Sequence, residues 1–213
     1  MIKYNDKCTG CTACENVCKF NAIKMQDDKD GFKYPHIDKK LCVDCKACEK
    51  VCPLNSKKEI KKFENKAYAC FCNDNSLRLK SSSGGIFSVI ATKILEDNGV
   101  VYGAAFDEEY KVKHFKVNNI ENIEKLRGSK YVQSDLDGIF KDIEVELKSG
   151  KKVLFSGTQC QVAGLLSYLK NEYSNLDRIF ELYLRGDIKK LLSKYAGVGI
   201  YPTINKLGKT VQL

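Results

Sequence analysis

Two runs of sequence decide how this chain folds: Cys8-Thr-Gly-Cys11-Thr-Ala-Cys14-Glu-Asn-Val-Cys18 and Cys42-Val-Asp-Cys45-Lys-Ala-Cys48-Glu-Lys-Val-Cys52-Pro53. Each run separates its four cysteines by two, two and three residues, and the chain has eleven cysteines among its 213 residues. In a cytosolic protein, cysteines at such regular spacings indicate metal ligands or redox groups rather than disulfides. The repeat therefore predicts a metal-binding head at the N-terminal end.

We expect these eight cysteines to hold two [4Fe–4S] clusters. Three thiolates from one tight loop reach three corners of one cluster, and the fourth cysteine, on the chain leaving the loop, ligates the other cluster. One cluster is thus assigned to Cys8, Cys11, Cys14 and Cys52, and the second to Cys42, Cys45, Cys48 and Cys18. Lys19 stands where a proline usually follows the first run, and all eight ligands remain present.

Two other readings of the cysteines are weaker. Zinc accepts four cysteines, but usually as two separated pairs, so a zinc-binding interaction module is a remote alternative. A disulfide scaffold needs an oxidising compartment. No apolar signal core precedes Cys8 and no apolar run approaches the length of a membrane span, so we expect a cytoplasmic protein without a transmembrane helix.

The formal net charge is +9, from 36 Lys and Arg against 27 Asp and Glu. The basic residues are interleaved with acidic ones, and no nucleic-acid-binding signature accompanies them. We therefore expect no nucleic-acid partner. A lysine-rich surface that docks an acidic redox partner is the preferred interpretation.

Alternating helix-like and strand-like patterns after the head predict an α/β arrangement. We expect an α+β ferredoxin-like two-cluster domain over residues 1–60, an α/β domain with an open mixed sheet over 66–176, and a divergent tail over 177–213. Strands are expected over residues 67–72, 100–106, 112–117 and 152–155, and helices over 86–97, 120–126, 136–148 and 159–169.

Four further blocks follow the head in a fixed order: Ser81-Ser-Ser-Gly-Gly85-Ile-Phe, Val100-Val-Tyr-Gly-Ala-Ala-Phe, Leu126-Arg-Gly-Ser-Lys130-Tyr-Val-Gln-Ser134 and Val153-Leu-Phe-Ser-Gly157-Thr-Gln-Cys160-Gln161. With the head, they make residues 4–176 resemble the coenzyme F420 hydrogenase/dehydrogenase beta-subunit family. The family pattern does not continue beyond Leu176, so we expect a shortened member.

The resemblance implies an FAD-containing iron–sulfur oxidoreductase subunit. It would pass electrons between the clusters, FAD and a hydride carrier (deazaflavin or nicotinamide) or a redox partner protein such as ferredoxin. No Rossmann glycine pattern favours nicotinamide. The alternative is a non-catalytic, ferredoxin-type electron carrier or docking subunit.

The candidate flavin site combines three short segments. Ser82, Ser83, Gly84 and Gly85 open a helix and offer hydroxyl and N–H groups to an anion such as a flavin pyrophosphate, although an ordinary helix cap is the alternative. Lys130 and Tyr131, next to Arg127, form a polar cluster that suits an anionic flavin or phosphate, or else a solvated loop. Gly157 and Thr158 lie where a buried strand meets a helix, a common ligand position that is also an ordinary turn.

The remaining cysteines and histidines carry weaker signals. Cys160, at a helix N-terminus, is either a reactive thiol or a packed one. Cys70 and Cys72 alternate along a strand and are expected in the core. We expect structural roles for His36, in a loop, and for His114, in a strand.

Overall fold

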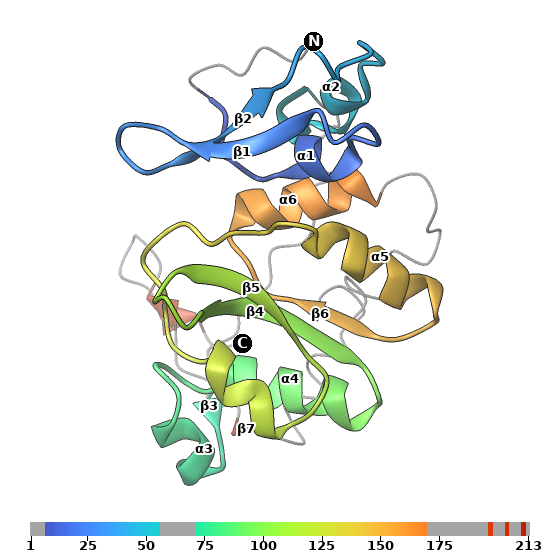
Figure 1. Cartoon of the computed structure of the whole chain (residues 1–213). Coiled ribbons are helices and arrows are strands. Elements are labelled where there is room, and N and C mark those ends of the chain that lie inside the picture. The colour runs from blue at the N-terminus through green and yellow to red at the C-terminus, as the bar shows by residue number, and fades with distance from the viewer. Residues whose placement is uncertain (1–6, 56–70, 170–195, 198–202, 205–209, 212–213) are drawn as a thin grey trace.

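A three-stranded mixed sheet lies at the centre of the computed structural model, which describes residues 7–55, 71–169 and the short pieces 196–197, 203–204 and 210–211 (Figure 1). The middle strand, β4 (Val100–Phe106), pairs antiparallel with β5 (Val112–Val117) and parallel with β6 (Val153–Phe155). The expected mixed sheet is therefore confirmed, and its strand order is β5-β4-β6.

Side chains of β4 alternate between two hydrophobic clusters, as the period of a strand requires. Val100 and Tyr102 face helices α5 (Ile139–Lys148) and α6 (Gln159–Tyr168). Val101 and Ala105 face α4 (Ile86–Glu96) and the 3-10 helix η2 (Glu121–Leu126). The sheet is thus covered by helices on both faces, which explains why β4 is apolar along almost its whole length.

Helices α4 and α5 end in the same way before the parallel strands β4 and β6. Past the end of α4, Asn98 takes a left-handed conformation, its N–H donates to the Leu95 carbonyl, and the N–H of Gly99 donates to the Ile94 carbonyl. Gly150 and Lys151 make the equivalent bonds after α5. These are Schellman motifs, and they confirm the helix end that Asn98-Gly99 predicts.

The head contains two short helices, α1 (Ala13–Val17) and α2 (Ala47–Val51), a hairpin of β1 (Ile23–Asp27) and β2 (Lys33–Ile37), and the 3-10 helix η1 (Pro53–Asn55). It lies on α6 (Figure 1). Ala13 and Val51 of the head belong to the same buried cluster as Phe140 and Leu165. One hydrophobic core therefore continues from the head into the sheet region.

The other elements are short. Strand β3 (Phe71–Cys72) precedes α3 (Asn75–Leu79) and pairs antiparallel with β7 (Ala196–Gly197), while β8 (Thr203–Ile204) pairs with β9 (Thr210–Val211). Cys72 is 2% exposed, which confirms its expected core position. Cys70 lies outside the described residues.

Two expectations need correction. The helix expected from residue 136 begins at Ile139, because Gly138 has a φ of 72°. His36 lies in β2 and not in a loop, since it pairs with Lys24 of β1 in the hairpin. The helix expected over residues 120–126 is present as the 3-10 helix Glu121–Leu126. The division of the chain into domains at residues 60, 66 and 176 stays a prediction.

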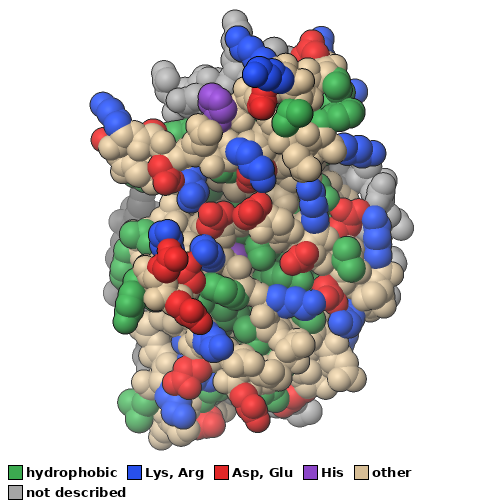
Figure 2. All heavy atoms as spheres, viewed as in Figure 1, with side chains coloured by type: hydrophobic (Ala, Val, Ile, Leu, Met, Phe, Trp, Pro, Cys, Tyr) green, Lys and Arg blue, Asp and Glu red, His purple; other side chains and the backbone are tan. Residues whose placement is uncertain are grey.

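Lysine and arginine side chains alternate with acidic ones over the face seen in Figure 2. Among the helices of the described residues, none combines the length and the apolar character needed to cross a bilayer.

Phe140→Ala should lower the free energy of unfolding by about 3–5 kcal/mol, because the side chain is fully buried and its removal leaves a cavity. Val145→Ala, on the same helix at a side chain 64% exposed, is the matched control and should have little effect. Denaturant unfolding followed by circular dichroism measures both. Equal losses in the two variants would contradict the assigned core.

Candidate functional site

The two cysteine runs fold into loops with the same backbone conformation. Gly10 and Thr12 have φ values of 63° and 62°, and the equivalent Asp44 and Lys46 have 53° and 59°. Left-handed φ values are unfavourable for residues with a Cβ atom, so the loops hold strain at three of these four positions. Loops of this kind turn backbone N–H groups into a concavity that suits an anionic group such as an iron–sulfur cluster.

Each loop borders a hollow, and the cysteines divide between the two hollows as the sequence predicts. Hollow I is lined by Cys8, Cys11, Cys14 and Cys52, together with Cys160. Hollow II is lined by Cys18, Cys42, Cys45 and Cys48. In each hollow the fourth cysteine of one run joins three from the other. Ligation itself stays a prediction, and in the described part of the chain no three His, Cys, Asp or Glu side chains gather closely enough for one metal ion.

Without a cation nearby, the surroundings of hollow I disfavour the thiolate form of its cysteines. Burial, and then the neighbouring Cys11 and Cys8, raise the pKa of Cys14 to about 12. Burial also raises the pKa values of Cys8 and Cys11. Because a cluster is ligated by thiolates, the positive charge of iron is what would offset this cost. The donor set fits a [4Fe–4S] cluster.

A cavity of about 620 Å³ lies between the head and the sheet, within the usual size range of cofactor sites. Four predicted site residues line it: Lys130, Tyr131, Gly157 and Thr158. Its wall also includes Cys8, Thr9 and Gly10 of the first cysteine loop. We call this the large cavity.

The other predicted flavin residues lie elsewhere. Ser82, Ser83, Gly84 and Gly85 line a separate hollow with Arg127 and Gly128. Gly128 lines both this hollow and the large cavity, so the two are neighbours. The guanidinium Nε of Arg127 donates to Ser88 Oγ at 3.0 Å, which fixes Arg127 over the start of α4.

Lys130 lines the large cavity and is hydrogen-bonded to Arg127, which lines the neighbouring hollow. Its Nζ donates to the Arg127 carbonyl at 2.7 Å, and burial lowers its pKa. Tyr131 is 95% exposed, so it has room to contact a bound molecule or solvent.

Gln161 fixes the wall at the start of α6. Its Oε1 accepts from the Thr158 backbone N–H at 2.9 Å in a capping box, and its Nε2 donates to Ser134 Oγ at 2.8 Å. Both partners line the large cavity. Local sequence gives no sign of this role for Gln161, because its partner Ser134 is distant in the chain.

His114 also lines the large cavity, which the expectation of a structural role did not anticipate. Its ring stacks on Phe155 with centroids 5.1 Å apart, and Nε2 lies 3.0 Å from the Ser156 carbonyl. The carbonyl can only accept, so Nε2 carries the proton. Burial lowers the pKa of His114 and keeps the ring neutral. Alternation along β5 placed His114 on one face of the sheet, and only the tertiary structure showed the cavity there.

Comparison with known protein families places a 4Fe-4S dicluster domain at residues 7–56. It also matches residues 67–141 to the N-terminal region of the coenzyme F420 hydrogenase/dehydrogenase beta subunit. These two matches support the family resemblance of the sequence blocks. No curated protein matches the chain. Because the dicluster domain contains both cysteine runs, the matches support an iron–sulfur electron-transfer role.

The chain purified without oxygen should contain about eight irons and eight labile sulfides, and Cys45→Ala should lower both to about four. Cys72→Ala is the control, because this buried cysteine lines neither hollow, and its iron content should equal that of the parent. Iron, sulfide and zinc analysis measures the outcome. Zinc in place of iron and sulfide would rule out the clusters.

Proposed function

We propose that this chain is a flavin-linked oxidoreductase subunit that passes electrons between two [4Fe–4S] clusters, FAD and a hydride carrier or redox partner. The observation that carries the proposal is a shared wall. Cys8, Thr9, Gly10 and Cys160 line both hollow I and the large cavity. A cluster in hollow I and a molecule in the large cavity would therefore be separated only by this wall.

The eight cysteines hold the clusters crosswise in a ferredoxin-like head. Cys8, Cys11, Cys14 and Cys52 bind the first cluster, which we call cluster I. Cys18, Cys42, Cys45 and Cys48 bind the second, cluster II. Since Cys45 is exposed and Cys14 is buried, cluster II lies nearer to solvent. Electrons would then exchange with a redox partner at cluster II, and with a molecule bound in the large cavity at cluster I.

FAD, when bound, couples the one-electron transfers of the clusters to two-electron hydride chemistry. The large cavity takes its ring system, since this is the space beside hollow I. Gly157 and Thr158 line the cavity at the strand–helix junction, and Lys130 brings a cation to it. The neutral His114 and the buried Gln161 complete a wall that excludes water from one side.

The phosphates fit the neighbouring hollow at the start of α4. This eleven-residue helix directs its free N–H groups toward Ser82, Ser83 and Gly84. Arg127 adds a positive charge at the same place. Gly85, the cap residue, has a φ of 77°, and a Cβ atom there would lie 3.2 Å from the Cβ of Cys72, so glycine suits this turn.

The alternative function, a non-catalytic electron carrier, needs the head alone. It predicts clusters without flavin in the full chain. The two functions are therefore separated by one measurement, the ratio of FAD to iron in protein kept free of oxygen.

Ala104→Phe should weaken FAD binding at least ~10-fold, because the added ring would project from β4 into the large cavity. Iron and sulfide should stay at the parent level, since Ala104 lines neither cluster hollow. Titration of the cluster-loaded chain with FAD, followed by flavin fluorescence, measures the affinity.

Phe115→Ala is the control for this experiment, because Phe115 lies on the neighbouring strand and does not line the large cavity. It should bind FAD as the parent does. A parent chain that holds both clusters and binds no FAD would eliminate the flavin-linked function in favour of the electron carrier.

A further inference from the structure

The two cluster hollows differ in what encloses them. Hollow II is lined by residues 18–48 of the head within the part of the chain that the structure describes. Hollow I is lined by head residues and also by Cys160 and Ala163 of α6. Only hollow I is therefore completed by an element of the sheet region, although the two cysteine runs are alike in sequence.

Gly164 brings α6 into direct contact with a cysteine of hollow I. A Cβ atom at this position would lie 3.0 Å from the Cβ and carbonyl oxygen of Cys11 and 3.1 Å from its Sγ. No side chain fits there unless Cys11 moves. Cys45 holds the equivalent place in the second run and is exposed, so hollow II has no such contact at that cysteine.

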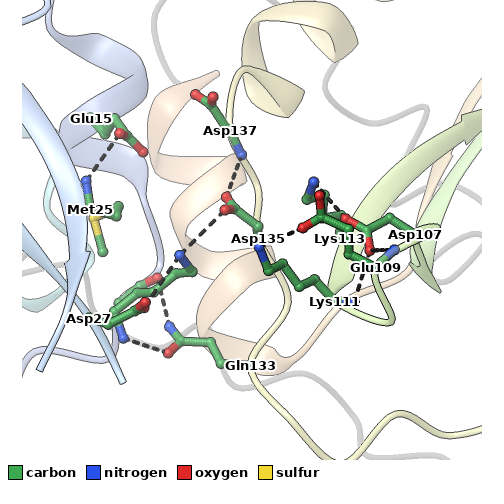
Figure 3. A network of polar contacts seen from close by, with 12 residues as sticks. Glu15, Met25, Asp27, Asp107, Glu109, Lys111, Lys113, Gln133, Asp135 and Asp137 are labelled. Carbon is green, nitrogen blue, oxygen red and sulfur yellow. Dashed lines mark hydrogen bonds and ion pairs between the residues drawn. The ribbon is translucent and has the colours of Figure 1, made fainter. Parts of the chain in front are cut away.

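The loop that carries Cys11 is fixed from a second side. Gln133 accepts from the Lys33 backbone N–H at 2.9 Å and donates to the Gly10 carbonyl at 3.5 Å (Figure 3). Lys33 Nζ also forms ion pairs with Asp27 and Asp135, each at 3.4 Å. The segment that follows η2 and the helix α6 thus hold the first cysteine loop between them.

Cys160 lies at the junction of these parts. Its Sγ is 3.1 Å from Thr158 Oγ1 and 4.0 Å from the Thr9 carbonyl. Thr9 belongs to the cluster loop and Thr158 begins α6, so the thiol lies between the cap of the helix and the head. This thiol lines hollow I and does not line hollow II.

We propose that Gly164 and Cys160 are positioning residues that make the reduction potential of cluster I depend directly on α6, which lines hollow I but not hollow II. Hydrogen bonding, burial and solvent access around a cluster set its potential. For cluster I, helix α6 contributes to the hydrogen bonding, to the burial and to the limits on solvent access. The inference rests on the proposed function, since it requires both clusters.

The test is an anaerobic redox titration of the full-length Gly164→Ala variant, with electron paramagnetic resonance of the two reduced clusters. Alanine normally favours a helix over glycine, so the change does not weaken α6 by its own propensity. The added methyl group displaces Cys11. We expect the midpoint potential and line shape of cluster I to change while those of cluster II stay as in the parent.

Two more variants make the result specific. Cys160→Ala alters the wall of hollow I without crowding it, and it should also change the cluster I signal alone. Val43→Ala alters a side chain that lines hollow II and is 57% exposed, and it should change only the cluster II signal. Cys45→Ala, which removes a predicted ligand of cluster II, identifies which signal belongs to which cluster.

Each outcome decides the proposal. Loss of about half the iron from Gly164→Ala, with the cluster II signal retained, supports it. Equal changes in both signals, an even loss of both clusters, or unchanged potentials in Gly164→Ala and Cys160→Ala would overturn it. A parent protein without iron and sulfide would instead defeat the proposed function, so the two failures are distinguishable.

Discussion

The contact between α6 and the first cysteine loop is the constraint on which the arrangement of the site depends. Gly164 and Cys11 approach so closely that a Cβ atom at position 164 would crowd Cys11, so the helix and the loop lie this near because residue 164 is glycine. Because α6 also packs its buried Leu165 and Leu169 into the core beneath the sheet, the same ten-residue helix joins the head to β4 and β6. The distance between hollow I and the large cavity is thereby set by backbone packing.

The large cavity forms where the head packs against the sheet region. Its walls come from the cysteine loop, from the hairpin of the head, from the segment after η2 and from the start of α6. Side chains that cross between these parts, such as Gln133 and Gln161, use both their donor and acceptor groups. Satisfied amides at such positions hold several loops in one geometry, which is what a cofactor site requires.

Much of the fold followed from local patterns. The strands over residues 100–106 and 112–117 lie where alternation predicted them, and Asn98-Gly99 ends α4. Two local signals were missed. Gly138 delays the start of α5, and the hairpin that contains His36 was missed although the turn pair Asp30-Gly31 lies between its two strands. The residues predicted for a flavin line two neighbouring spaces, a division that the sequence did not predict, and their role in binding stays a prediction.

The sequence alone determined the chemistry of the head, since eight thiols at these spacings can serve two iron–sulfur clusters crosswise and little else. It also determined the sheet strands, because strand periodicity is a local property. Only the tertiary structure decided that hollow I adjoins the large cavity, that His114 lines it and that Gly164 touches Cys11. The physical reason is that these contacts join residues more than a hundred positions apart, and no local pattern encodes which distant surfaces pack together.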